Sequence, residues 1–193
     1  MSTDLSTQNH NIPPVFDKDS RVLVLGSFPS VMSRKQEFFY GHPRNRFWRI
    51  IALICSEQTP DDIKRKKQLL LSHGIAVWDV IKSCDIRGSS DTSITNVIPN
   101  DISVILESCD IQMIFCNGTR SFELYERFIY PKTKIKAVKL PSTSPANAAF
   151  NEKKLFDSWK ILKEYIKATP HDHCVSDAPS GFSSECPFLP QFY

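Results

Sequence analysis

The chain has 193 residues, of which 41% are hydrophobic and 23% are charged, so it has enough apolar content for one domain with its own core. It contains no run of about 18 apolar residues that would span a membrane, and its first twenty residues lack the charged-then-apolar order of a signal peptide. The six cysteines form no C-x-x-C pair, and their spacing is not typical of zinc or iron–sulfur sites. We therefore expect an intracellular protein, cytoplasmic or nuclear, with buried or free thiols and with neither a metal nor another cofactor.

The charge is unevenly distributed along the chain. The formal net charge is +3, but residues 1–20 carry −2 and residues 169–193 carry −3, which leaves +8 on residues 21–168. A basic domain is compatible with an anionic partner such as nucleic acid, although a solvated lysine-rich surface explains the charge equally well. The composition predicts a flexible N-terminal segment over 1–20, an α/β domain over 21–168, and a flexible acidic tail, rich in Pro and Ser, over 169–193.

Strand and helix patterns alternate along the first half of this domain. A buried strand over residues 21–26 is followed by a helix over 46–55 with one apolar side. A cap, a proline and two acidic residues at 59–62 predict the start of a second helix, which ends before a strand over 74–80. Residues 81–98 show no clear period and are predicted to form a long loop.

The second half continues the alternation. It predicts a short helix over 100–108, a strand over 111–118, a helix over 119–130, a strand over 135–140 and an amphipathic helix over 151–168. Four strands separated by helices imply an α/β fold, namely a three-layer α/β/α sandwich with a central four-stranded, mostly parallel sheet.

Polar and aromatic residues gather where these strands end. They lie in the segments 26–45, 78–80, 117–120 and 141–147, each of which follows a predicted strand. In an open parallel sheet, ligands bind outside the carboxyl ends of the strands. These four segments are therefore predicted to form one site.

Four motifs in these segments carry a family resemblance. They are GSFPS, the Y-x-H-P-x-N-x-F-W pattern over residues 40–48, G-I-x-x-W-D over 74–79 and LPSTSPA over 140–146. Together they resemble the uracil-DNA glycosylase superfamily over about residues 20–168, and most closely its hypoxanthine-DNA (deoxyinosine) glycosylase branch. The resemblance implies a uracil-DNA glycosylase-like fold and hydrolysis of the N-glycosidic bond of a damaged base that is taken out of the DNA stack.

Two residues are the first candidates for the chemistry. Most of the superfamily has an Asp or Asn that holds the attacking water where this chain has Phe28. A phenyl ring can instead stack on the flipped base, which is worth about 1–3 kcal/mol, although Phe28 can also be a core residue. The resemblance implies that Asn45 is catalytic, because its amide oxygen can accept from water while its nitrogen donates; without the resemblance, Asn45 is more often a helix cap.

Three further residues are predicted to bind the base. Asp79 ends a strand, and its carboxylate can accept from the N1–H of hypoxanthine, although a structural carboxylate explains it nearly as well. Tyr40 and His42 are predicted to wall the pocket.

The loop over residues 141–147 is predicted to supply hydroxyl groups. It contains no histidine, whereas in the wider superfamily this loop often supplies one that hydrogen-bonds the leaving base, and Ser144 is the nearest replacement. An ordinary Ser/Pro turn is the alternative. Contacts with the DNA backbone are expected from Ser27, Ser30, Ser142, Arg44 and Arg46, although each arginine alone can be a plain surface charge.

The sequence thus predicts a monomeric, monofunctional DNA glycosylase. No lysine lies in the four motifs to form a Schiff base, so we expect an abasic product from DNA that contains a deaminated base, without a metal. Alternatives are action on uracil or xanthine, and a catalytically silent DNA-binding protein, because Phe28 lacks a polar group and the loop lacks a histidine. A serine hydrolase is disfavoured because GSFPS departs from G-x-S-x-G.

Overall fold

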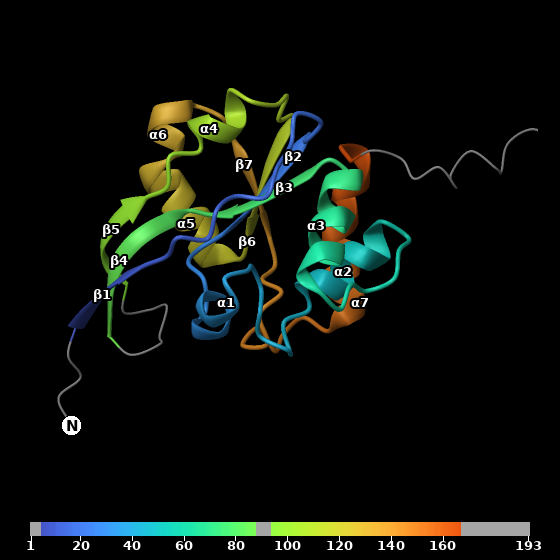
Figure 1. Ribbon diagram of the computed structural model, residues 1–193, viewed down its shortest axis with the longest axis horizontal. Coiled ribbons are helices and arrows are strands. Elements are labelled where there is room, and N and C mark those ends of the chain that lie inside the picture. Colours follow the sequence, from blue (N-terminus) through green and yellow to red (C-terminus); the bar gives the residue numbers. More distant parts are fainter. Residues whose placement is uncertain (1–4, 88–93, 167–193) are drawn as a thin grey trace, which may run out of the picture.

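A four-stranded parallel sheet lies at the centre of the molecule, as the computed structural model in Figure 1 shows. The structure describes residues 5–87 and 94–166. The strands of this sheet are β2 (Val22–Gly26), β3 (Ile75–Asp79), β6 (Met113–Asn117) and β7 (Ala137–Leu140), and their order is β3-β2-β6-β7 with every pair parallel. The expected four-stranded sheet is therefore confirmed.

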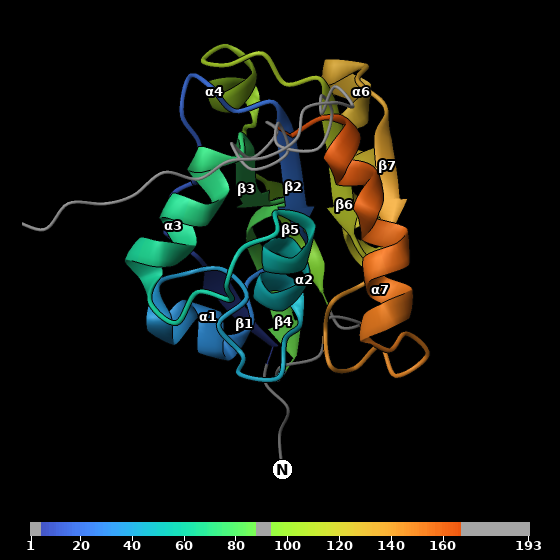
Figure 2. The same ribbon diagram turned by 90° about the vertical axis from the view of Figure 1, so that its right-hand side faces the viewer.

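Helices cover both faces of this sheet, which confirms the three-layer prediction. One face carries α2 (Phe47–Ile54), α3 (Ile63–Ser72) and α7 (Glu152–Trp159), which lie in front of the sheet in Figure 2. The other face carries α4 (Ser103–Leu106), α5 (Thr119–Phe128) and α6 (Tyr130–Thr133). The two faces bury separate hydrophobic clusters, because alternate residues of a strand point to opposite sides of its sheet.

The sequence of β2 is that of an interior strand of the sheet. Val22 and Val24 point into the cluster under α2 and α7, whereas Leu23 and Leu25 point into the cluster under α5. All four side chains are fully buried. A continuous apolar run is what a strand needs when helices cover both of its faces.

Helices α3 and α7 begin at side-chain caps, although α3 is capped by the last residue of the 59–62 segment and not, as predicted, by the first. Asp62 accepts from Arg65 N at the start of α3 (2.7 Å), and Asn151 accepts from Lys154 N at the start of α7 (2.9 Å). Helix α7 ends earlier than predicted, and a 3-10 helix (Lys160–Glu164) follows it. The chain also forms α1 (Val31–Gln36), which no periodicity indicated.

A second sheet replaces the long loop that was predicted over residues 81–98. It contains β1 (Leu5–Asn9), β4 (Ile81–Arg87) and β5 (Thr95–Pro99) in the antiparallel order β1-β4-β5. The pairing of β4 with β5 shifts register near Ser83, and the buried positions of β4 change phase at the same place. This irregularity removed the alternation that would have identified the strand, so the loop prediction was wrong.

The N-terminal residues are also part of the ordered structure. Residues 5–20 were expected to be flexible, but they include β1, and they bury Ile12 and Val15 in the core. Val15 forms a two-way backbone pair with Val77 of β3 (3.0 and 2.9 Å). Backbone pairing depends little on side-chain type, which is why composition did not predict it. The predicted acidic tail over residues 169–193 lies outside the described residues.

Candidate active site

A pocket lies where β2, β3, β6 and β7 end, at the edge where the sequence predicted a site. Its volume is about 120 Å³. The chain runs from β2 to β3 on one side and then crosses to β6 on the other side of β2, so this edge contains the point where the strand order reverses. The pocket is lined by Gly26, Ser27, Phe28, Pro29, Ser30, Ser33, Phe39, Tyr40, Asn45, Asp79, Asn117, Ser142, Thr143 and Ser144.

The side-chain oxygen of Asn45 is occupied by the protein itself. Asn45 Oδ1 accepts from the backbone N–H of Phe47 (3.0 Å) at the start of α2 and from the hydroxyl of Thr143 (2.9 Å). The atom that faces Phe47 must be the oxygen, because a backbone N–H can only donate. Both lone pairs of the oxygen are then engaged, and only the Nδ2 amino group can bind a pocket ligand. Asn45 thus binds the first N–H of α2 and also lines the pocket, but its oxygen is not available to water as the sequence had suggested.

Asp79 lies across the end of β2 and contacts Gly26 closely. Its side chain is 4% exposed and lines the pocket. A Cβ atom on Gly26 would lie 2.2 Å from Asp79 Oδ1, which is much closer than real atoms approach. Only glycine therefore allows the carboxylate to reach this position, which explains the glycine that opens the GSFPS motif.

Tyr40 contributes a buried hydroxyl beside Asp79. Its ring stacks on Phe47 with the ring centroids 3.8 Å apart, and its backbone has the left-handed φ of 52° that non-glycine residues rarely adopt. Burial, and then the negative charge of Asp79, raise the pKa of Tyr40, so the hydroxyl remains a donor at neutral pH. The Asn117 amide is close enough to affect this pKa, but the hydroxyl makes no hydrogen bond of normal geometry within the described residues. A donor is therefore available to a ligand.

Phe28 belongs both to the core and to the pocket. It is 8% exposed and lines the pocket beside the end of β2. The His10 ring packs edge-on against it (centroids 5.5 Å apart, planes at 75°), and the Arg34 guanidinium carbon lies 5.3 Å from its centroid. These two contacts fix the ring in place. The two interpretations of Phe28, as core residue and as pocket residue, are therefore compatible.

Arg46 holds the loop over residues 141–150 in place. Its guanidinium donates to the carbonyl oxygens of Thr143 (3.3 Å), Ser144 (2.6 Å), Asn147 (3.1 Å) and Phe150. These bonds engage four of its five N–H groups. The contact with the DNA backbone that was predicted for Arg46 stays a prediction, and the geometry favours a structural role instead.

The predicted serines lie around the mouth of the pocket. Ser30 caps α1 by accepting from Ser33 N (3.2 Å), and Ser142 accepts from Ser144 N (3.2 Å). Ser144 accepts from Ala146 N (3.3 Å). A hydroxyl that accepts in such bonds still has its own proton to donate. Ser142 and Ser144 can therefore each donate to a ligand. The Ser30 hydroxyl also lies 3.0 Å from that of Ser33, and the structure records no such bond for the fourth serine, Ser27.

His42 and Arg44 lie next to the pocket but are not among the residues that line it. His42 Nδ1 accepts from Arg44 N (3.1 Å) within the turn that leads to Asn45. Arg44 is exposed, as a DNA contact requires. The expectation that His42 walls the pocket is therefore not supported by its position.

Thr143 and Asn117 are among the pocket residues that were not predicted as site residues. Thr143 is fully buried, and Asn117, at the end of β6, contacts it through two hydrogen bonds. Asn117 follows a strand just as Asp79 does, so its position at the sheet edge was the signal that could have identified it. Thr143 lies between Ser142 and Ser144, which were predicted as site residues, and its own burial could not be read from the sequence.

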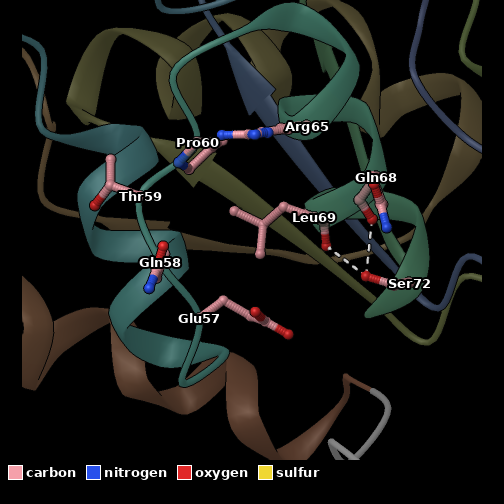
Figure 3. A pocket seen from close by; sticks show the side chains of 8 residues that line it. All are labelled: Glu57, Gln58, Thr59, Pro60, Arg65, Gln68, Leu69 and Ser72. Atoms are coloured by element: carbon pink, nitrogen blue, oxygen red, sulfur yellow. Dashed lines mark hydrogen bonds between the residues drawn. The ribbon is translucent and has the colours of Figure 1, made fainter.

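A larger pocket lies between α3 and the loop over residues 57–60, away from the strand ends. Figure 3 shows it, with a volume of about 330 Å³. It shares no lining residue with the strand-end pocket, and its Arg65 is paired with Asp61 (3.0 Å). Ser72 donates back to the carbonyl oxygens of Gln68 and Leu69. These polar groups are satisfied within α3 and the residues just before it, so size alone does not make this pocket the candidate site.

Residues 5–87 and 94–166 contain no group of three or more His, Cys, Asp or Glu side chains arranged to hold a metal ion. Over the same residues, no helix has the length and apolar character needed to cross a membrane.

Comparisons with known proteins agree with this fold. A family model described as the uracil DNA glycosylase superfamily matches residues 13–165. Relatives from Methanosarcina acetivorans and Methanosarcina barkeri, both named hypoxanthine DNA glycosylase, are 35% and 32% identical over 144 and 145 residues. Each alignment covers 72% of this chain and 89% of the relative.

A solved structure shows the same relationship. The solution NMR structure of a Methanosarcina acetivorans protein, described as a candidate uracil DNA glycosylase, superposes with a TM-score of 0.71 at 28% identity. The match covers 82% of this chain and 98% of that chain. The fold and the relatives are thus those of a DNA N-glycosylase. The chain belongs to the uracil DNA glycosylase superfamily.

Proposed function

We propose that this glycosylase excises hypoxanthine from deoxyinosine in DNA by hydrolysing the N-glycosidic bond. The observation that carries the proposal is the polarity of the pocket. Asn45 can offer only N–H donors, because its oxygen is engaged, and the carboxylate of Asp79 is an acceptor in the same pocket. The names of the two Methanosarcina relatives favour hypoxanthine as the base.

This donor and acceptor pair matches the edge that deamination creates. Hypoxanthine presents an N1–H donor beside an O6 acceptor, whereas adenine presents an N6 donor and no N1 proton. In our proposal, Asp79 accepts from N1–H and the Asn45 amino group donates to O6. Adenine would place a donor against the donors of Asn45 and a lone pair against the carboxylate. Guanine, uracil and xanthine share the N–H and carbonyl pattern, so pocket shape must separate them from hypoxanthine.

The proposed reaction depends on positioned dipoles more than on a strong base. Phe28 stacks on the flipped base, and the C1′–N9 bond weakens as the sugar becomes oxocarbenium-like. Negative charge then develops on the purine, where the Asn45 amino group and the Tyr40 hydroxyl are available donors. Donors that are fixed in advance stabilise such charge most effectively. Water attacks the sugar carbon, and an abasic site remains.

The same pocket supports a monofunctional enzyme. None of the described residues that line it is a lysine. Lys139 lines an adjacent pocket, which shares Ser142 and Ser144 with the first. A lyase needs an amine that reaches C1′ to form a Schiff base. We therefore expect strand breakage only after alkali is added.

The test is a panel of oligonucleotides that each carry one inosine, uracil, xanthine, adenine or guanine, in single-stranded and duplex form. Products are cleaved at abasic sites with alkali after a single turnover. We expect inosine to react fastest and adenine not at all. Product from uracil or xanthine but not inosine would contradict the choice of base. Tight binding to every substrate without product would indicate the catalytically silent alternative.

A further inference from the structure

We propose that Thr143, held by Asn117, is a positioning residue that fixes the orientation of the Asn45 amide. The inference rests on the proposed function for its link to base excision. Thr143 is 0% exposed, and its hydroxyl lies between the side chains of Asn117 and Asn45. Asn117 lies at the end of β6, Thr143 in the loop after β7, and Asn45 in the loop before α2. We call them the Asn117–Thr143–Asn45 chain.

The direction of the first bond follows from the backbone of Thr143. Its N–H donates to Asn117 Oδ1 (3.0 Å), so this atom must be the oxygen of the amide. The other end of the same amide is then Nδ2, and it lies 2.9 Å from Thr143 Oγ1. Asn117 therefore donates to the Thr143 hydroxyl.

The direction of the second bond follows from the backbone of α2. The N–H of Phe47 identifies the oxygen of Asn45, which lies 2.9 Å from Thr143 Oγ1. An amide oxygen can only accept, so the proton of the Thr143 hydroxyl points toward Asn45. The side-chain bonds of the Asn117–Thr143–Asn45 chain thus run in one direction, and the Thr143 and Phe47 backbone N–H groups, which cannot reverse, fix the two amides at its ends.

This direction determines what Asn45 presents to a base. If the amide rotated by half a turn, its amino group would face two donors, the Phe47 N–H and the Thr143 hydroxyl, and its oxygen would face the pocket. An oxygen at that position would accept from the N6 amino group of adenine instead of donating to O6 of hypoxanthine. Thr143 supplies one of the two donors that oppose this rotation. Hydrogen bonds that run in one direction also polarise one another, which makes the Asn45 amino group a stronger donor.

Three variants test the inference by separating shape from hydrogen bonding. Thr143→Val keeps the side-chain shape and removes the hydroxyl, whereas Thr143→Ser keeps the hydroxyl and removes a methyl group. We expect Thr143→Val to lower the single-turnover rate on inosine DNA about tenfold to 100-fold, as loss of a supporting hydrogen bond does at other sites. The affinity for the DNA should change less than about threefold, because phosphate contacts dominate it. Thr143→Ser should recover most of the rate.

Asn117→Asp tests the direction of the bonds. The introduced carboxylate still accepts from Thr143 N, but its second oxygen also accepts, so the Thr143 hydroxyl turns away from Asn45. We expect a loss like that of Thr143→Val at neutral pH and a recovery relative to wild type as the pH falls and the introduced carboxyl gains a donating proton. A structural defect would not recover in this way.

Two results would overturn the inference. One is a wild-type rate for Thr143→Val in a protein with an unchanged melting temperature. The other is a loss in Asn117→Asp that does not depend on pH, together with a failure of Thr143→Ser to recover the rate.

A measurement on the free protein separates this inference from the proposed function. A slowly exchanging hydroxyl proton of Thr143, seen by NMR near the Phe47 amide proton, is expected whether or not inosine is the substrate. Absence of that proton would overturn the inference even if inosine is excised. Its presence in an enzyme that excises no inosine would refute only the proposed function.

Discussion

Two pockets of the described residues differ in how their polar groups are held. The pocket between α3 and the loop that precedes it has a volume of about 330 Å³, and its bonds are local: the Ser72 hydroxyl donates to Gln68, four residues earlier. The strand-end pocket has a volume of about 120 Å³, but its Thr143 bonds Asn45, which is 98 positions away in the sequence. A binding site needs donors and acceptors with fixed directions, and only long-range bonds fix them here. The smaller pocket is therefore the candidate active site.

The largest expected effect comes from removing the donors of Asn45 while keeping its oxygen. In Asn45→Asp, one carboxylate oxygen still accepts from Phe47 N and from Thr143, but no N–H faces the base. We expect the excision rate to fall about 100-fold to 1,000-fold, the usual cost of losing one transition-state donor. The melting temperature should stay close to that of the wild type. Single-turnover assays and calorimetry measure the two quantities.

The matched control lies in the other pocket. Gln68→Ala removes an exposed side chain from its wall, and both rate and stability should stay unchanged. An Asn45→Asp enzyme that excises hypoxanthine at the wild-type rate would show that the amino group of Asn45 is not a reacting donor.

A smaller loss is expected when the charge of Asp79 is removed. Asp79→Asn keeps the shape but replaces a charge-assisted hydrogen bond to N1–H with a neutral one, which is about half as strong. The rate on inosine DNA should fall about tenfold to 100-fold, equivalent to about 1.4–2.7 kcal/mol. N1-methylinosine has no N1 proton. If this base is cleaved at all, Asp79→Asn should lower its excision rate less than it lowers that of hypoxanthine. Equal losses on both bases would mean that Asp79 does not read N1–H.

Gly26→Ala should act through the same carboxylate. The new Cβ would lie 2.2 Å from Asp79 Oδ1, so the carboxylate must move away from the end of β2. We expect about a tenfold loss of rate and about 1–3 kcal/mol of lost stability, as for other overpacked sites. Urea unfolding and single-turnover kinetics test this. In the double variant with Asp79→Asn, the two rate losses should not add, because both act on one side chain.

The smallest effect is expected at Tyr40, and here stability and rate should diverge. Tyr40→Phe removes a buried hydroxyl that has no hydrogen-bond partner in the described residues, so stability should stay the same or rise slightly. The excision rate should fall only a few-fold, since one weak donor is lost. A large loss of stability would show that the hydroxyl has a partner in solution.

The pH dependence at Tyr40 has a definite sign. Burial, then Asp79, raise the pKa of Tyr40 above its usual value of about 10. The unfolded chain releases this proton at about pH 10 while the folded chain keeps it, so stability should fall as the pH rises above that value. The fall should be less steep in Tyr40→Phe, and urea unfolding at a series of pH values measures it. An identical slope in both proteins would contradict the raised pKa.

Much of the site could be predicted because it lies close to recognisable strands. Asp79 ends an apolar run, and parallel strands bring their carboxyl ends to one edge. Asn117 also ends a strand, whereas Asn45 was chosen on the family resemblance. Arg46 was expected to contact the DNA backbone or to be a plain surface charge, because its half-buried position against the loop carbonyls depends on a fold that sequence does not display.

The sequence by itself determined the parallel sheet, its covering helices and the edge where the site lies, because apolar periodicity and capping residues are local signals. The tertiary structure alone decided the three-stranded sheet, since a register shift near Ser83 hides its period. It also decided which atom of Asn45 faces the pocket, because that depends on Thr143, nearly a hundred residues away. The direction of a hydrogen bond is set by the partners that folding supplies, and no residue type specifies it in advance.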